Sequence, residues 1–417
     1  MRTGLVLGGG SARGAYEAGV VHYLRTELAR DLGRQVSLDV LTGTSVGALN
    51  ASYIAGTAHA PELQGQGMVD TWRGLKIEEI LQFGYGDIFR VLREFMGKTP
   101  MRWESGLTGG LVNPAGLLHV VARVVPWRQV ARNIKSGAVH ALAISSTHVA
   151  TGQNFVFIQR NGGGAPQWSR DPNTAAIPTR IGPKHALASA ALPVIFPSVR
   201  IGGHLFVDGG LRHNLPLSPA LRLGAERVII VPLRHQPSPG EVRAKAAMAQ
   251  RETHVGSAPF LLGKTMNALL LDSTDQDLDR LERINALIEA GNSAFGPTFA
   301  ETLNSALVPL RNQPVKYVRR IVIRPSTDMG ALAAEYIRSA EFKKRVANKV
   351  VGRVVRRLAE REGGAENDLV SYLLFDGGFA DQLIQMGMSD ARAQRSEWLR
   401  FFAEEREPAT AKETGTG

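Results

Sequence analysis

Short apolar runs and longer stretches of helical spacing alternate along the N-terminal part of the chain. Residues 3–7, TGLVL, form an apolar run that ends in glycines, and residues 12–29 then carry apolar side chains at helical intervals. A second run, SLDVLTG at residues 37–43, ends beside Ser45, and residues 46–56 again have helical spacing. Short apolar runs are typical of buried parallel strands, which are commonly connected by amphipathic helices. The pattern therefore predicts repeated strand–helix units.

Apolar runs continue through the middle of the chain. Residues 140–160, HALAISSTHVATGQNFVFIQR, are typical of a strand pair, and residues 161–174 are typical of a surface loop. Further single strands are expected at residues 202–210, 226–233 and 318–325. Because strands alternate with helices, we expect an α/β fold, a three-layer sandwich with a largely parallel central sheet.

From about residue 242 the spacing of the apolar residues is mainly helical. Residues 264–291 place six apolar side chains near one face of a long helix. The six are Met266, Leu270, Leu278, Leu281, Leu287 and Ile288. A further helical region is expected from Ala331 to Glu362.

These patterns divide the chain of 417 residues into three parts. We expect residues 1–235 to form the α/β domain, residues 236–404 a mainly helical extension packed on it, and residues 405–417 a disordered polar tail. The contents of 44% hydrophobic and 21% charged residues are typical of a globular protein that is large enough to bury a sizeable core.

The residue content also excludes some kinds of chemistry. The chain has no cysteine, which excludes disulfides, thiolate zinc sites and cysteine nucleophiles. No cluster of histidines and carboxylates has the spacing of a metal site, so no metal or diffusible cofactor is expected. The start of the chain lacks the apolar segment of a signal peptide, and no apolar stretch reaches the roughly 18 residues of a membrane span. We therefore expect a cytoplasmic protein.

The net charge of +11 and the isoelectric point near 10.1 favour a polyanionic partner. No zinc-finger spacing, RNA-binding aromatic signature or basic zipper supports nucleic acid, so we expect none. Residues 337–364 are rich in Lys and Arg. Read as a helix, this segment aligns five apolar residues along one stripe, namely Phe342, Val346, Val350, Val354 and Leu358. Such a helix either packs on the domain with a solvated basic face or docks on anionic lipid as a peripheral membrane contact.

Ser45 is a candidate nucleophile because it stands between an expected strand and an expected helix. Gly43 and Gly47 complete the pattern G-x-S-x-G, with Thr44 and Val46 between the glycines and the serine. A serine on a sharp strand-to-helix turn has an exposed hydroxyl, and the small glycines let strand and helix approach closely. The other interpretation is an ordinary tight turn.

A glycine-rich loop, GGGSARG at residues 8–14, follows the first expected strand. The backbone N–H groups of such a loop bind anions, either a phosphate or the oxyanion of a transition state. The dinucleotide pattern G-x-G-x-x-G fails, since Arg13 or Ser11 stands where it needs glycine. Loops after parallel strands emerge at one edge of the sheet, which favours an oxyanion hole beside Ser45 over a nucleotide-binding module.

Asp208 is the candidate base, because it ends an expected strand and because Gly209 and Gly210 permit close backbone approach. A second Asp-Gly-Gly starts at Asp376, which follows an expected helix and is interpreted as a helix-end turn residue. A Ser-His-Asp esterase of the α/β-hydrolase kind is the alternative. Its candidate histidines lie in segments with no evident reason to converge on Ser45; they are His213, His235 and His254.

Together these three motifs resemble the patatin-like phospholipase family, in particular bacterial members with a helical C-terminal extension. The family pattern is a glycine-rich oxyanion loop, then G-x-S-x-G, then a distant D-G-G or D-G-A, here at residues 9–14, 43–47 and 208–210. ASAALPVIFPSV before the acid and NLP after it are similar too, so the resemblance covers about residues 4–222. Ser11 departs from the pattern, because the family's loop usually has glycine there.

The resemblance implies a serine lipid acyl hydrolase of the phospholipase A or lysophospholipase type, with a Ser–Asp dyad and no histidine. Ser45 would attack the carbonyl of a phospholipid or other lipid ester, and Asp208 would accept its proton. The implied oxyanion loop consists of Gly9, Gly10, Ser11, Ala12, Arg13 and Gly14, with N–H donors at Gly9, Gly10 and Ser11. Arg13 would hold either a phosphate head group or the loop itself. A catalytically silent scaffold that binds membrane or protein is the alternative class.

Overall fold

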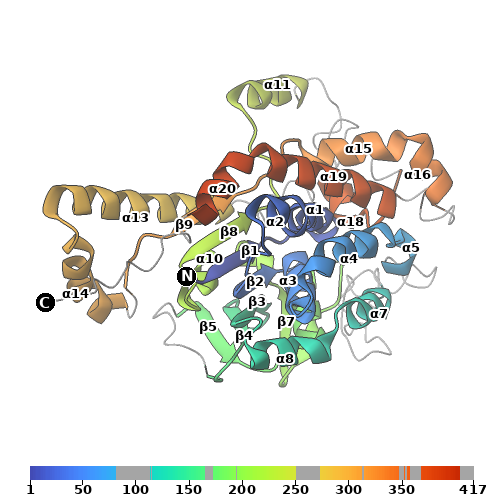
Figure 1. The fold of residues 1–417 in the computed structure, drawn as a ribbon. Coiled ribbons are helices and arrows are strands. Elements are labelled where there is room, and N and C mark those ends of the chain that lie inside the picture. Colours follow the sequence, from blue (N-terminus) through green and yellow to red (C-terminus); the bar gives the residue numbers. More distant parts are fainter. Residues whose placement is uncertain are drawn as a thin grey trace, which may run out of the picture.

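The computed structural model has a nine-stranded central sheet with helices on both faces (Figure 1). It describes residues 1–80, 113, 115–164, 172–193, 195–249, 273–311, 314–346, 352, 355–356 and 368–403. The strands described are β1 (Thr3–Leu7), β2 (Val40–Thr44), β3 (Ala141–His148), β4 (Asn154–Arg160), β5 (Thr174–Pro178), β6 (Val199–Ile201), β7 (His204–Asp208), β8 (Arg227–Val231) and β9 (Arg319–Val322). They follow the order β5-β4-β3-β2-β1-β8-β9, and the β6–β7 hairpin joins the sheet through β3.

The strand pairs at the centre of the sheet are parallel. β1 pairs in parallel with β2 and β8, β2 pairs with β3, and β8 pairs with β9. The strand pair expected at residues 140–160 is the antiparallel hairpin of β3 and β4, and β7 also lies antiparallel to β3. The expected α/β fold with a largely parallel central sheet is therefore confirmed.

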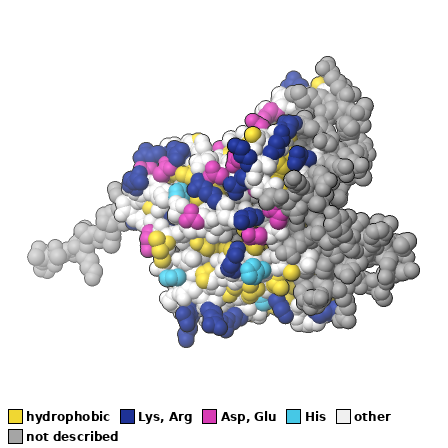
Figure 2. All heavy atoms as spheres, turned by 90° about the vertical axis from the view of Figure 1, so that its right-hand side faces the viewer, with side chains coloured by type: hydrophobic (Ala, Val, Ile, Leu, Met, Phe, Trp, Pro, Cys, Tyr) yellow, Lys and Arg dark blue, Asp and Glu magenta, His cyan; other side chains and the backbone are white. Residues whose placement is uncertain are grey.

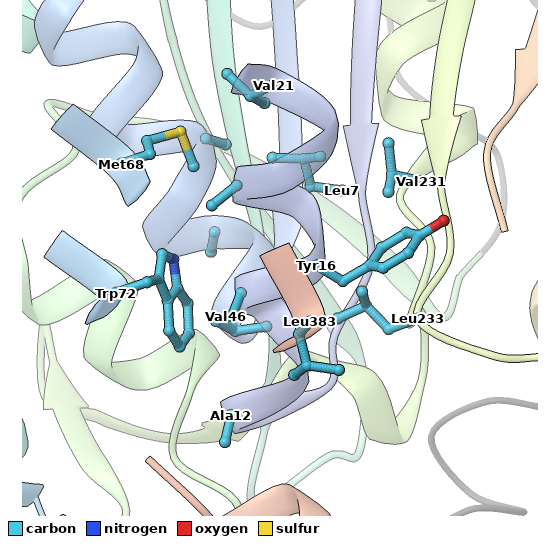
Figure 3. Close-up of a cluster of buried hydrophobic side chains, with 14 of the residues drawn as sticks. Leu7, Ala12, Tyr16, Val21, Val46, Met68, Trp72, Val231, Leu233 and Leu383 are labelled. Atoms are coloured by element: carbon cyan, nitrogen blue, oxygen red, sulfur yellow. The ribbon is translucent and has the colours of Figure 1, made fainter. Parts of the chain in front are cut away.

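The central strands are buried on both faces, so their side chains alternate between two cores. Leu5 and Leu7 of β1 belong to the larger core, with side chains of α1 (Ala15–Arg25), α3 (Val46–Thr57) and α19 (Gly377–Ala393). Figure 3 shows part of this core, with Leu7 and Tyr16 beside Val231. Val6 belongs to the smaller core, with side chains of α10 (Leu217–Arg222) and α13 (Ser273–Phe295). The sheet is thus the middle of three layers.

The remaining helices described surround these layers. They are α2 (Glu27–Leu32), α4 (Pro61–Arg73), α5 (Ile77–Ile80), α7 (Ala115–Val124), α8 (Trp127–Ser136), α9 (Pro183–Ser189), α11 (Pro239–Ala249), α14 (Phe299–Arg311), α15 (Met329–Arg338), α16 (Ala340–Arg345), α18 (Asp368–Leu373) and α20 (Arg395–Ala403), with 3-10 helices η1 (Ser11–Gly14) and η2 (Gly209–Leu211). Among the helices that the structure describes, none is long and apolar enough to cross a membrane.

The C-terminal part of the chain is built into the same sheet and the same helical layer. β9 extends the sheet beyond β8, and α19 lies alongside α1 (Figure 1). The two helices approach closely at glycines: a Cβ on Gly19 would lie 2.1 Å from the carbonyl oxygen of Ile384, and one on Gly387 would lie 2.3 Å from that of Tyr16. A domain boundary after residue 235 stays a prediction, as does the tail at residues 405–417, which lies outside the described residues.

The long helix α13 differs in part from its expected apolar face. Leu278, Leu281 and Ile288 are buried, but Leu287 is 53% exposed, so the expectation that it shares their face was wrong. Adjacent residues on a helix point about 100° apart, and with Ile288 facing the core Leu287 faces solvent. Met266 and Leu270 lie outside the described residues.

The basic segment 337–364 is not one continuous helix. Ser339 is extended and caps α16 by accepting a hydrogen bond from the N–H of Phe342. The helix ends at Arg345, and Val346 is extended again, so the expected stripe of apolar residues is broken after its first member. The stripe positions Val350, Val354 and Leu358 lie outside the described residues.

Candidate active site

Ser45 lies at the turn between β2 and α3 in a backbone conformation that residues with side chains rarely adopt. Its φ is 54° and its ψ is −123°. In the described part of the chain, Ser11 is the other non-glycine residue with positive φ, also 54°. Strained residues of this kind cluster at functional sites. Glycines make the turn possible, because a Cβ on Gly43 would lie 2.2 Å from the carbonyl oxygen of Gly47.

The hydroxyl of Ser45 donates a hydrogen bond of 2.6 Å to Oδ2 of Asp208, 163 residues further along the chain. The sheet brings the two residues together, because β3 pairs with β2 and with β7, at whose end Asp208 lies. Oδ1 of Asp208 accepts a bond of 2.7 Å from the N–H of Gly210. A Cβ on Gly209 would lie 2.3 Å from the carbonyl oxygen of Ser145, so only glycine fits against β3 here.

Burial raises the pKa of Asp208 to about 6, because the residue is 1% exposed and its charged form loses hydration. The hydrogen bonds from Ser45 and Gly210 act in the opposite direction and stabilise the charge. A carboxylate with this pKa is mostly deprotonated at neutral pH, yet it is a stronger base than an ordinary aspartate. The pair therefore has the geometry and the electrostatics of a nucleophile and its base.

The glycine-rich loop runs from β1 into η1 beside Ser45. The N–H of Gly9 donates to the carbonyl oxygen of Asn214 at 3.2 Å, and Nδ2 of Asn214 donates to the carbonyl oxygen of Gly9 at 3.3 Å. The expectation of a third oxyanion donor at Gly9 is therefore corrected, since this N–H is already engaged. Within the described residues, the N–H groups of Gly10 and Ser11 have no such partner, and both residues line the same pocket as Ser45.

Ser189, at the end of α9, is a site residue that sequence reasoning missed. Its buried hydroxyl accepts the N–H of Ser45 at 2.8 Å and donates to the carbonyl oxygen of Ser145 on β3 at 2.6 Å. It therefore ties the strained turn to the neighbouring strand. The residue is the first serine of ASAALPVIFPSV, but nothing local indicates what this serine contacts.

Arg13 turns away from the pocket and into the interior, where it is 3% exposed. Its guanidinium donates to Oγ of Ser371 at 2.9 Å and to Oδ1 of Asp368 at 3.1 Å. It also lies over the ring of Tyr372, 4.1 Å from the ring centre. Of the two roles expected for Arg13, these contacts fit the one in which it holds the loop.

In the described part of the chain, the side chains of the histidines of the alternative triad have partners other than the dyad. Nε2 of His213 lies 3.5 Å from Asp277, and Nε2 of His235 lies 3.3 Å from Glu241. His254 lies outside the described residues. The described residues also hold no group of three or more His, Asp or Glu that could bind a metal ion.

Asp376, the second Asp-Gly-Gly aspartate, repeats the local geometry of Asp208 in a different environment. It caps the start of α19 and accepts the N–H of Gly378 at 2.9 Å. Its carboxylate faces the hydroxyl of Tyr336 and the guanidinium of Arg345. It follows the helix α18, as interpreted from the sequence, but it caps the start of the next helix rather than ending one.

The dyad borders a pocket whose walls are mostly apolar. A second apolar pocket adjoins it between α3, α4 and α7. Four residues line both pockets: Val46, Leu49, Leu117 and Phe375. Figure 3 shows Trp72, which lines the second pocket, beside Val46. A second apolar pocket therefore lies next to the space beside the hydroxyl of Ser45.

Comparison with known proteins gives two findings. The family model described as patatin-like phospholipase matches residues 5–221, which include the glycine-rich loop, the turn at Ser45 and Asp208. Among solved structures, the crystal structure of VipD from Legionella pneumophila aligns with 99% of this chain and 94% of its own chain, at 11% sequence identity and a TM-score of 0.27.

Proposed function

Because the chain belongs to the patatin-like phospholipase family, we propose that it hydrolyses lipid esters with Ser45 as the nucleophile and Asp208 as the base. The observation that carries this proposal is the bond of 2.6 Å between the hydroxyl of Ser45 and the buried carboxylate of Asp208. A serine hydroxyl is a weak nucleophile until an adjacent base accepts its proton. Family membership supports lipid acyl hydrolysis in general, and this pair supplies the chemistry.

In the proposed reaction, Oγ of Ser45 attacks the ester carbonyl carbon as its proton passes to Oδ2 of Asp208. The N–H groups of Gly10 and Ser11 donate to the oxyanion of the tetrahedral intermediate, and each such donor contributes about 2.7–4 kcal/mol in comparable sites. The intermediate collapses to acyl-Ser45, and Asp208 returns the proton to the departing alcohol. Water then attacks the acyl-serine and Asp208 takes one of its protons. As this intermediate collapses and releases the fatty acid, Asp208 returns the proton to Oγ of Ser45.

The two adjoining pockets support the proposal that the substrate carries a long acyl chain, which binds there. The walls shared by the pockets are apolar, and the second pocket leads away from Ser45 toward Trp72. Burial of each methylene of an acyl chain contributes about 0.8 kcal/mol. We therefore propose activity of the phospholipase A or lysophospholipase type, in which the ester lies at Ser45 and the chain occupies the apolar cavity.

We also propose a peripheral contact with anionic lipid. Lys343 and Lys344 are exposed on α16, whereas Arg345 beside them is engaged with Asp376. Figure 2 shows the side of the molecule on which α15 and α16 lie in Figure 1. Lys and Arg side chains are mixed with Asp and Glu in its upper part, and further Lys and Arg side chains lie along its lower edge. Each Lys or Arg near an anionic surface adds about 1 kcal/mol to binding.

Hydrolysis of a soluble p-nitrophenyl ester and labelling by a fluorophosphonate test the proposed dyad. Ser45→Ala and Asp208→Asn should each remove nearly all hydrolysis, and the double variant should be little worse, because the two residues act as a unit. Asp376→Asn is the matched control and should keep most of the activity per folded molecule. Wild-type-like hydrolysis by Asp208→Asn would end the dyad assignment. A wild-type chain that neither hydrolyses the ester nor is labelled at Ser45 would leave the silent scaffold as the better interpretation.

A further inference from the structure

Arg13 links the glycine-rich loop to a helix from the far end of the chain. Its side chain contacts three residues of α18, Asp368, Ser371 and Tyr372, and all of them are buried. The hydroxyl of Ser371 in turn donates to the carbonyl oxygen of Asp368 at 2.6 Å. The guanidinium is thus held by an ion pair, a hydrogen bond and an aromatic ring at once, an arrangement that the planar, always charged arginine favours.

The backbone of the same arginine closes the turn that carries the oxyanion donors. The N–H of Arg13 donates to the carbonyl oxygen of Gly10 at 3.1 Å, and Ser11 lies inside this turn with its φ of 54°. A side chain makes that left-handed conformation unfavourable, so the turn needs support from its surroundings. Arg13 is the residue of the loop whose side chain provides a rigid external attachment.

The helix α18 is itself fixed to the body of the protein and to the pocket. Tyr372 and Phe375 line the cavity beside Ser45. Immediately after them, the N–H of Gly377 donates to the carbonyl oxygen of Leu75 at 3.0 Å, and α19 begins its contact with α1. The attachment point of Arg13 is therefore rigid, and it lies at the wall of the proposed active site.

We propose that the C-terminal extension completes the oxyanion hole, with Arg13 as the positioning residue through which α18 sets the N–H groups of Gly10 and Ser11. This inference rests on the proposed hydrolase function. Without the attachment, Ser11 relaxes from its left-handed conformation and its N–H turns away from the developing oxyanion. The substrate binds in the apolar cavity as before, so the loss falls on the transition state rather than on substrate binding.

Steady-state hydrolysis of a soluble ester by Arg13→Met, Ser371→Ala and Tyr372→Phe tests this role. We expect kcat to fall about 100-fold in Arg13→Met and several-fold in Ser371→Ala, with KM little changed, since loss of one oxyanion donor costs about 10² to 10³ in kcat. Tyr372→Phe keeps the ring under the guanidinium and should lose the least. Arg13→Lys keeps the charge beside Asp368 and should recover part of the activity of Arg13→Met.

Arg227 offers a matched control. It is also a buried arginine that lies over an aromatic ring of the extension, 4.5 Å from the ring centre of Phe402, and its Nε donates to Thr3 at 2.9 Å. It does not line the pocket beside Ser45. Arg227→Met should lower thermal stability while the kcat per folded molecule stays near that of the wild type.

Inhibition by a trifluoromethyl ketone separates a role of Arg13 in positioning the oxyanion donors from a general loss of stability. Such a ketone adds to the catalytic serine and is bound as an oxyanion. Its affinity should fall in Arg13→Met in parallel with kcat/KM, whereas the affinity for a free fatty acid should not change. If the folded Arg13→Met variant keeps the wild-type kcat and ketone affinity, the inference is overturned. If Arg13→Met does not fold, the same result for Ser371→Ala overturns it. If the wild type and Arg227→Met are themselves inactive and unlabelled by fluorophosphonate, the proposed function fails instead.

Discussion

Replacing Asp208 with Asn measures how much the buried charge of Asp208 lowers the free energy of unfolding. The two side chains have the same size, and only the carboxyl group becomes charged. Burial raises the pKa of Asp208 from 3.8 to about 6, so the folded chain binds this proton more tightly than the unfolded chain does. Below about pH 4 both states are protonated and the carboxyl costs nothing. As the pH rises from about 4 to about 6 the wild-type fold loses stability, and above that window the cost is constant.

The size of this cost follows from the shift in pKa. A rise of about two units corresponds to about 3 kcal/mol, since one unit is about 1.36 kcal/mol. The Asp208→Asn variant avoids the cost, and its amide oxygen can still accept the N–H of Gly210. We therefore expect the variant to be nearly inactive yet more stable than the wild type at pH 7.5, by up to about 3 kcal/mol, and not more stable at pH 4.

Urea unfolding followed by circular dichroism at the two pH values gives the free energies of unfolding. Asp376→Asn is the control, because that carboxylate pairs with Arg345 and caps α19, so its loss should destabilise the fold at pH 7.5. The reasoning is refuted if the difference between Asp208→Asn and the wild type is the same at both pH values, or if the variant is the less stable protein at pH 7.5.

Four further outcomes are expected. The kcat/KM for a soluble ester should fall about tenfold per pH unit below about pH 6, because Asp208 must be deprotonated to act as base. A kcat/KM that stays constant down to pH 4.5 would contradict this role. Ser189→Ala should reduce kcat about tenfold and the free energy of unfolding by about 1–3 kcal/mol, because the buried N–H of Ser45 loses its acceptor. If neither kcat nor the free energy of unfolding changes, Ser189 has no role in the site. Hydrolysis of a monomeric ester should survive chelation by EDTA, and complete loss would show a missed metal requirement. Neutralising Lys343 and Lys344 should weaken salt-sensitive binding to anionic vesicles without changing hydrolysis of a soluble ester. Neutralising two basic residues of α8 should leave vesicle binding unchanged. Equal vesicle binding by the two variants would exclude α16 as the docking face.

The parts of the site that the sequence predicts are those in which chemistry and backbone geometry are encoded locally. Gly43, Gly47 and Gly209 are required because a Cβ at any of them would make contacts shorter than 3 Å, so these motifs are visible as residue patterns. The edge at which they meet follows from the parallel pairing of β1 and β2, which short apolar runs predict. For this reason the proximity of the glycine-rich loop to Ser45 could be expected from the sequence. Asp208 is not placed by this rule, because it ends β7, which lies antiparallel to β3.

The remaining features depend on partners that are distant in sequence. Nothing near Gly9 indicates that Asn214 engages its N–H, and nothing near Arg13 indicates that Asp368 will be its counter-ion. The break at Ser339 was missed because a serine caps a helix only where the chain also turns, which the periodicity of its neighbours does not record. Side-chain hydrogen bonds between distant segments carry no periodic signal, so sequence patterns alone could not identify them.

The pairing of β9 with β8 has a consequence for shortened forms of the protein. β8, RVIIV, is buried along its whole length, and among the described strands β9 covers the edge that β1 leaves open. A chain ending at residue 235 would hold every residue of the proposed dyad and loop, yet it would present an apolar edge strand with unpaired N–H and C=O groups. Such edges recruit strands from other molecules. Aggregation is therefore a separate obstacle to making the N-terminal half alone, in addition to the loss of the α18 residues that hold Arg13.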